Sequence, residues 1–215
     1  MLATVDNIKA AVREILDEIG INDALFLGGS DQSNLDVIIA SKIEDAIRHI
    51  YLVADEQFLE PSMKQQELDP TTSLSTGVAR LSMELDGKFL RLVSAQADEW
   101  LYPVREYIPE SDSRYPTLFN RYSTGTPERP KAGMRYSGGK RYLDLYGVTR
   151  KQFATVEYVL LPNTKETNFP VYDQCYRPIL YYIAGLVLLT YKDEHADSLF
   201  NIALNEVGAN IPQNQ

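Results

Sequence analysis

The sequence has few of the side chains that bind soft metals or form disulfides. Its 215 residues include one cysteine, Cys175, and two histidines, His49 and His195. One thiol makes no internal disulfide, and these three side chains do not supply the ligands of a zinc or iron–sulfur site. The first residues lack the basic and apolar order of a secretory signal. We therefore expect a protein of a reducing compartment with no metal and no other cofactor.

Long hydrophobic runs are also missing. The longest strongly apolar stretch covers residues 179–189, which is well short of the roughly 20 residues that a membrane-spanning helix needs. We expect it to be a core helix and the protein to have no membrane partner. With 44% hydrophobic and 24% charged residues, the chain has the composition of a globular protein of one or two domains.

Charge is distributed unevenly along the chain. The net charge is -9, with 21 basic and 30 acidic residues. Residues 1–70 alone carry a net charge of -9, whereas residues 113–151 carry +7. A chain of this kind can pair its acidic first part with the basic middle of a second copy, or present one sign of charge to another partner.

Hydrophobic spacing changes from helical to alternating and back to helical along the chain. Apolar residues recur at helical spacing in 4–19, 35–59, 179–191 and 193–207, and they alternate with polar residues in 79–94, 126–146 and 153–161. The turn Asp86-Gly87 predicts a hairpin over 79–94, and Gly138-Gly139 predicts a second one over 126–146. Pro178 is expected in the first turn of its helix, and Asn34 is expected to cap the second helix.

We therefore predict an α+β fold, in which an N-terminal and a C-terminal helix pair form a helical bundle with a β-rich central insertion of hairpins. The predicted bundle comprises residues 1–75 and 170–207, and the insertion comprises residues 76–165. Residues 60–76 are interpreted as a polar linker, 28–30 as a loop and 208–215 as a flexible tail.

Motifs for catalysis are not found. The stretch 133–140 resembles a phosphate-binding loop, but five residues rather than four separate Gly133 from Gly139, and Arg141 stands where a magnesium-binding Ser or Thr is needed. The acid pair Asp98-Glu99 is adjacent in sequence, so its two side chains point in different directions. No Gly-x-Ser-x-Gly element occurs. We predict that the protein is not an enzyme.

The basic, tyrosine-rich second hairpin is the best candidate for a binding surface. Its candidate interface residues are Arg129, Lys131, Arg135, Tyr136, Lys140, Arg141 and Tyr142. Arginine with tyrosine suits both single-stranded nucleic acid and the centre of a protein interface. Because the chain as a whole is acidic, with a sequence pI near 4.8, we favour contact with an acidic protein.

The order of elements and several stretches resemble the head-to-tail connector or adaptor proteins of tailed bacteriophages, especially the ring and collar subunits of short-tailed and crAss-like phages. The stretches that carry this resemblance are the acidic amphipathic opening helices, Phe89-Leu90-Arg91-Leu92-Val93-Ser94, Trp100, Pro103-Val104-Arg105-Glu106, Gly125-Thr126-Pro127-Glu128-Arg129-Pro130, Pro178-Ile179-Leu180-Tyr181-Tyr182-Ile183-Ala184-Gly185-Leu186, Ala196, Leu199 and Ala203.

This resemblance implies a virion structural protein of the neck, assembled in the cytoplasm of a bacterial host. Copies would form a homo-oligomeric ring, expected to be a dodecamer, that joins the portal protein to the tail or to other ring proteins. Genomic DNA would pass through its channel without sequence-specific binding. Two alternatives remain open: an assembly factor that is absent from the finished virion, and an accessory enzyme or nucleic-acid-binding protein whose site the sequence does not display.

Overall fold

The computed structural model describes residues 1–18 and 32–209. Contacts divide the chain into two compact units. We call residues 1–60 with 161–215 the helical unit, and residues 61–160 the strand-rich unit. Of the sequence predictions, the loop at 28–30 and most of the tail, 210–215, lie outside the described residues.

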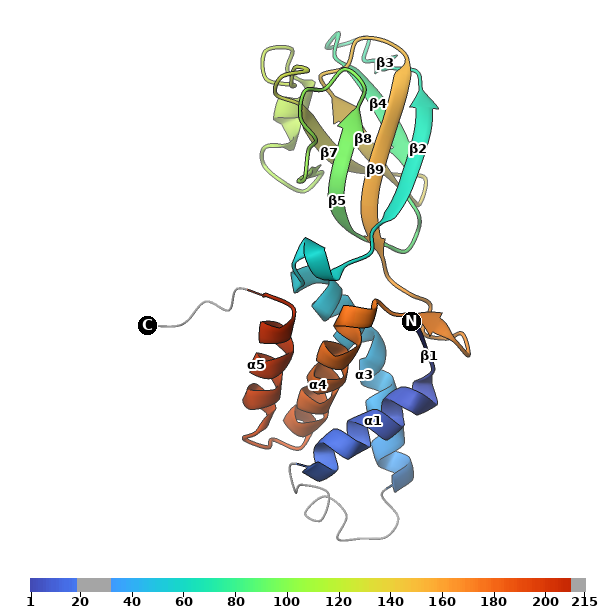
Figure 1. Ribbon diagram of the computed structural model, residues 1–215. Helices are drawn as coiled ribbons and strands as arrows, with labels where there is room; N and C mark the ends of the chain where they lie inside the picture. Colours follow the sequence, from blue (N-terminus) through green and yellow to red (C-terminus); the bar gives the residue numbers. More distant parts are fainter. Residues whose placement is uncertain (19–31, 210–215) are drawn as a thin grey trace. The chain divides into compact units, whose positions relative to one another are not determined.

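The helical unit is built around one apolar helix (Figure 1). Helix α4 (Asp173–Thr190) packs against α1 (Val5–Glu18), α3 (Gln32–Val53) and α5 (Ala196–Glu206). In α1, the residues Ile8, Val12 and Leu16 are buried, four residues apart, as the amphipathic spacing predicts. A two-stranded sheet of β1 (Leu2–Ala3) and β10 (Phe169–Pro170) and a 3₁₀ helix, η1 (Glu56–Phe58), complete this unit.

Two helix starts differ from the prediction. Helix α4 begins at Asp173, so Pro178 lies inside the helix rather than in its first turn. Tertiary contacts hold the added turn: the amide of Tyr172 donates to the hydroxyl of Tyr51, and the buried Cys175 thiol donates to the carbonyl of Phe58. Helix α3 begins at Gln32, so Asn34 lies within its first turn and does not precede it as a cap.

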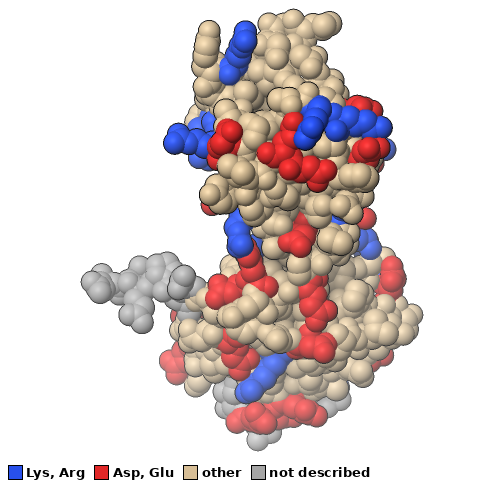
Figure 2. Space-filling model, turned by 45° about the horizontal axis from the view of Figure 1, so that its top comes forward, with Lys and Arg blue, Asp and Glu red and all other residues tan. Residues whose placement is uncertain are grey.

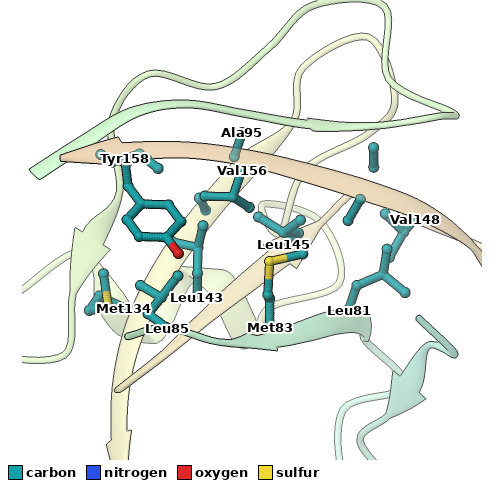
Figure 3. Packing of buried hydrophobic residues seen from close by; sticks show 14 of the residues in the cluster. Leu81, Met83, Leu85, Ala95, Met134, Leu143, Leu145, Val148, Val156 and Tyr158 are labelled. Carbon is teal, nitrogen blue, oxygen red and sulfur yellow. The ribbon is translucent and has the colours of Figure 1, made fainter. Parts of the chain in front are cut away.

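The strand-rich unit is a sandwich of two sheets. One has the order β2–β9–β5 (Ser62–Leu68, Gln152–Leu160, Phe89–Ala97). The other has the order β3–β4–β8–β7–β6 (Thr71–Thr72, Ala79–Glu84, Lys140–Tyr146, Lys131–Ser137, Ile108–Pro109). Figure 3 shows side chains of β5 and β9, such as Val156 and Tyr158, facing Met83, Leu143 and Leu145 of β4 and β8. A 3₁₀ helix, η2 (Tyr115–Phe119), packs on β7.

The predicted fold class is wrong. Residues 1–18 and 32–209 hold four α-helices and ten strands in three sheets, and this is not a bundle of two terminal helix pairs with an insertion of hairpins. The predicted 79–94 hairpin is absent, because β4 and β5 belong to different sheets: β4 pairs with β8, and β5 pairs with β9. Alternation shows which side chains face a core but not which strand is the neighbour, and the turn Asp86-Gly87 connects two strands of different sheets. A further sheet, β1–β10, lies outside the predicted insertion.

The predicted polar linker is also partly wrong. Residues 62–68 form β2, which pairs with β9 along its full length. Its side chains are exposed or half-buried, so this edge strand has no alternating apolar pattern that sequence reasoning could use. The predicted boundaries at 75 and 170 therefore differ from the observed division at 60 and 161. The second hairpin, by contrast, is confirmed, since β7 and β8 pair from Lys131 with Tyr146 to Ser137 with Lys140.

Candidate functional site

The seven candidate interface residues are carried by the β7–β8 hairpin and by the turn before it. In this register Arg135 lies opposite Tyr142, and Tyr136 lies opposite Arg141. Successive side chains of a strand point to opposite faces, so these two pairs lie on different faces of the sheet. Ala132 and Met134 lie on the same face as Tyr136 and belong to the sandwich core. The face that carries Arg135 is the outer face.

A buried carboxylate organises the outer face. Asp144 of β8 is fully buried, and it accepts hydrogen bonds from Ser82 Oγ at 2.6 Å and from Arg135 Nε at 3.0 Å. Arg80 Nη1 lies 3.5 Å from the same carboxylate. A buried acid is stable only when it is paired and hydrogen-bonded, and these three strand residues supply that environment.

The basic groups on the outer face are engaged by their neighbours. The guanidinium of Arg135 lies 4.8 Å from the ring centroid of Tyr142, and its hydrogen bond to Asp144 raises its pKa above the ordinary value. The Lys140 ammonium lies 2.9 Å from a carboxylate oxygen of Glu84, whose hydrogen bond raises the lysine pKa. These contacts assign Arg135 to the folding of the sheet and leave Lys140 in an exposed ion pair.

The other basic candidates lie at two separate places. At the hairpin tip, Arg141 Nη1 donates to the carbonyl of Phe89 at 2.6 Å, and its guanidinium lies 5.6 Å from the ring centroid of Tyr136. At the opposite end of β7, Lys131 Nζ donates to the carbonyl of Ser123 at 2.6 Å. Arg129 is exposed in the turn that precedes β7. About 20 Å of strand separates the two ends, at roughly 3.3 Å per residue.

The structure therefore does not bring the seven residues into one patch. They are spread over two faces and both ends of the hairpin, and Lys131, Arg135, Lys140 and Arg141 have partners within the fold. Alternation along 131–146 could have divided them between faces. The sequence does not show the partners of these basic residues and of Asp144, because Arg80, Glu84 and Phe89 come from strands that are distant in sequence.

Sequence reasoning missed an exposed surface made by two loops. The amide of Leu101 donates to the carbonyl of Pro127, which joins the loop after β5 to the turn before β7. Large apolar side chains are exposed in these loops: Leu101 at 65%, Tyr102 at 66% and Tyr122 at 96%. Figure 1 shows the loops, green and yellow-green, beside the sheets of the strand-rich unit. An aromatic that remains in solvent at a loop is a candidate contact for a partner.

Charge divides sharply between the two units. The helical unit has 18 acidic and 7 basic residues, a net charge of -11, whereas the strand-rich unit has 12 acidic and 14 basic residues, a net charge of +2. Figure 2 shows this difference from one side: acidic side chains predominate over the helical unit in the lower part, and most visible lysines and arginines belong to the strand-rich unit.

The remaining reactive groups are one cysteine and two histidines. Cys175 is buried, and burial raises the pKa of its thiol to about 12. His49 stacks on Tyr182 with ring centroids 4.6 Å apart, and burial lowers its pKa. His195 is exposed, and its Nδ1 lies 2.8 Å from Asp193. Within 1–18 and 32–209, no group of three or more His, Cys, Asp or Glu side chains is arranged to hold a metal ion.

One small hollow lies in the strand-rich unit. It has a volume of about 200 Å³ and is lined by Val104, Glu106, Tyr107, Ile108, Arg114, Pro130, Lys131 and Ala132. Its two cations are engaged elsewhere, Arg114 by Asp112 and Lys131 by Ser123.

None of the helices in the described ranges is long and apolar enough to cross a membrane.

Comparison of the sequence with models of known protein families and with curated proteins gives no match. The resemblance to phage connector proteins therefore stays a prediction.

Proposed function

We propose that this protein is a non-catalytic structural subunit of the neck of a tailed bacteriophage, which forms a ring between the portal protein and the tail. One observation carries the proposal: the charge separation between the two units, -11 on the helical unit and +2 on the strand-rich unit. Subunits with opposite charge on different parts of the chain favour head-to-tail contact between copies, and head-to-tail contacts generate rings when the rotation closes.

The exposed tyrosines and arginines of the strand-rich unit support the same proposal. Tyrosine and arginine are enriched where protein interfaces hold most of their binding energy. The apolar helix α4 is covered by α1, α3 and α5 of its own chain, so its hydrophobicity does not call for a neighbouring copy.

The acidic charge of the helical unit would repel DNA that passes through the ring. If it lines the channel of the ring, like charge keeps the duplex from adhering to the wall, so that DNA slides without sequence-specific binding. In this proposal the basic groups of the strand-rich unit contact the portal protein, the tail or a neighbouring subunit.

The test is to purify particles from the source and to quantify this chain by peptide mass spectrometry against the major shell protein and the portal protein. We expect a low ratio to the shell protein and a fixed ratio to the portal protein, unchanged between preparations and after washing at high salt. Absence of the chain from finished particles would contradict the proposal. It would favour the assembly factor or the accessory enzyme.

A further inference from the structure

The two loops of the strand-rich unit carry exposed arginines and exposed aromatic rings. Arg121 adjoins Tyr122, and Arg129 lies two residues beyond Pro127, whose carbonyl binds the loop of Leu101 and Tyr102. Neither arginine side chain forms an ion pair with any residue that the structure describes. We call Leu101, Tyr102, Arg121, Tyr122 and Arg129 the arginine–tyrosine loops.

These loops are held in place by the fold. The hydroxyl of Ser123 donates to the carbonyl of Thr117 at 2.7 Å, and Lys131 holds the carbonyl of Ser123. Gly147, at a positive φ of 83°, packs so closely on Thr126 that a Cβ there would lie 2.7 Å from its carbonyl oxygen. A surface whose backbone is fixed loses little conformational entropy on binding, so the exposed rings are presented ready for contact.

The helical unit offers a matching surface of opposite charge at the turn between α4 and α5. Leu189 and Tyr191 are exposed at 56% and 43%. Glu194 and Asp197 are exposed beside them, and neither forms an ion pair with a described residue. We call Leu189, Tyr191, Glu194 and Asp197 the acidic corner. Lys192 is the one basic residue of this segment, 189–197, which also contains Asp193, so its net charge is -2.

The acidic corner is also rigid. The amides of Tyr191 and Asp193 both donate to the carbonyl of Leu188, and Asp193 accepts from the amide and the ring of His195. Lys192 takes a positive φ of 59° to make this tight turn. The corner therefore presents two carboxylates next to two apolar side chains on a backbone turn that is held by hydrogen bonds.

We propose that the arginine–tyrosine loops of one copy bind the acidic corner of a second copy. Two arginines meet two carboxylates, none of which forms an ion pair with a residue of 1–18 or 32–209. Three exposed apolar side chains of the loops meet two of the corner. This inference rests on the proposed ring function, because it names the contact between neighbouring subunits. Nucleic acid fits the loops less well, since two arginines give little phosphate neutralisation on a chain with a net charge of -9.

The test uses the full chain and two charge-reversal variants, Arg121→Glu/Arg129→Glu and Glu194→Arg/Asp197→Arg. All four side chains lie at the surface, so folding should be unchanged. Sedimentation velocity is measured from about 1 μM to about 0.5 mM, the range in which a small interface self-associates. We expect wild-type protein to associate as its concentration rises. Each variant should associate on the order of 100-fold more weakly, because two close charge pairs become repulsive.

A mixture of the two variants gives the decisive result. In each variant alone the loops and the corner carry charge of the same sign, but in a 1:1 mixture the loops of each variant meet a corner of opposite sign on the other. The mixture should therefore associate as wild type does. A chain that carries all four reversals should associate like wild type, since the signs are exchanged. The control Lys88→Glu/Lys165→Glu has the same net charge as the first variant, and Asp45→Arg/Asp69→Arg has the same net charge as the second. Both should associate like wild type.

Three results would overturn the inference: a wild-type chain that stays monomeric over the whole range, single variants that associate as wild type does, or a mixture of the two variants that does not associate. Loss of DNA binding in Arg121→Glu/Arg129→Glu without any change in association would assign the loops to nucleic acid instead. Failure here is distinguishable from failure of the ring proposal. If the chain is present in particles at a fixed ratio, only this interface is wrong. If it is absent from particles while the mixed variants associate with each other, the interface stands without the phage role.

Discussion

Removal of the Asp144 carboxylate should destabilise the strand-rich unit more than any other single charge change on the same sheet face. The carboxylate is fully buried and has three partners, Ser82, Arg80 and Arg135. Loss of one partner of a buried pair costs about 3–5 kcal/mol, because the remaining charge is left uncompensated. The two arginine side chains are 24% and 23% exposed, so water recovers part of this and we expect the lower end of the range.

We therefore expect Asp144→Ala to lower the free energy of unfolding by about 3 kcal/mol, and Asp144→Asn by about 2 kcal/mol, because the amide oxygen keeps the hydrogen bond from Ser82. For a cooperative unit of 100 residues, a loss of 3 kcal/mol lowers the melting temperature by roughly 10–20 °C. Calorimetry measures the shift. Hydrogen exchange in β7 and β8 shows that the loss is in this unit.

A matched control lies on the same face. Glu84→Gln removes the exposed ion pair with Lys140 and should cost at most about 0.5 kcal/mol. The triple variant Arg80→Met/Arg135→Met/Asp144→Leu should recover at least half of the loss, since an apolar replacement leaves no buried charge unpaired. A loss in Asp144→Asn as small as that in Glu84→Gln would refute the role given to this carboxylate.

Three other residues give predictions that solution measurements can check. A Cβ at Gly185 would lie 2.6 Å from the ring of Phe200, so Gly185→Ala should lower the free energy of unfolding in urea by about 1–3 kcal/mol. Adding Phe200→Leu should restore most of this stability. An equal loss in the single and the double variant would contradict the clash. Burial lowers the pKa of His49, so the folded state binds fewer protons than the unfolded state. Stability should therefore fall as the pH drops below about 6.5. The fall should be shallower in His49→Gln, and an unchanged slope of stability against pH would be evidence against this role of His49. Burial tends to raise the pKa of Glu99, but hydrogen bonds from Thr149 and Gln152 hold it below its ordinary 4.5. The ionised Glu99 therefore stabilises the folded state above that pH, and this stabilisation is lost as the pH falls further. Thr149→Val should move the midpoint of acid unfolding to higher pH, and no shift would count against these hydrogen bonds.

The sequence was sufficient to predict elements whose stability is local. The spacing of Ile8, Val12 and Leu16 predicted α1, and the turn Gly138-Gly139 between two alternating stretches predicted the β7–β8 hairpin. In both, the periodicity and the turn residues lie within one short segment.

Strand partners could not be predicted, because they depend on contacts between distant segments. β9 lies between β2 and β5, and these strands are more than 50 residues away from it in the chain. Leu81 of β4 and Leu92 of β5 both point into the core, whether their strands pair with each other or face each other across a sandwich. Period-2 spacing is the same in the two cases.

The candidate interface residues are not gathered into one patch for a related physical reason. A run of bases indicates a basic surface, but Asp144 stands in the same hairpin and neutralises Arg135 from the neighbouring strand. An acid between Leu143 and Leu145, on a strand otherwise rich in apolar and aromatic residues, is the signal that could have warned of a buried ion pair.

Charge that is used inside a fold is not available to a partner, and this decides which surface of the chain can carry recognition. Arg135 is matched by the buried Asp144 of its own sheet, so a partner that binds it must first break that pair at a considerable cost in free energy. Lys140 is matched by Glu84 in an exposed pair that costs little to break. Arg121 and Arg129 form no ion pair with a described residue, and the two linked loops also carry the exposed rings of Tyr102 and Tyr122. A partner therefore gains more from the charged groups of the loops than from those of the hairpin, although the hairpin is the more basic of the two in sequence.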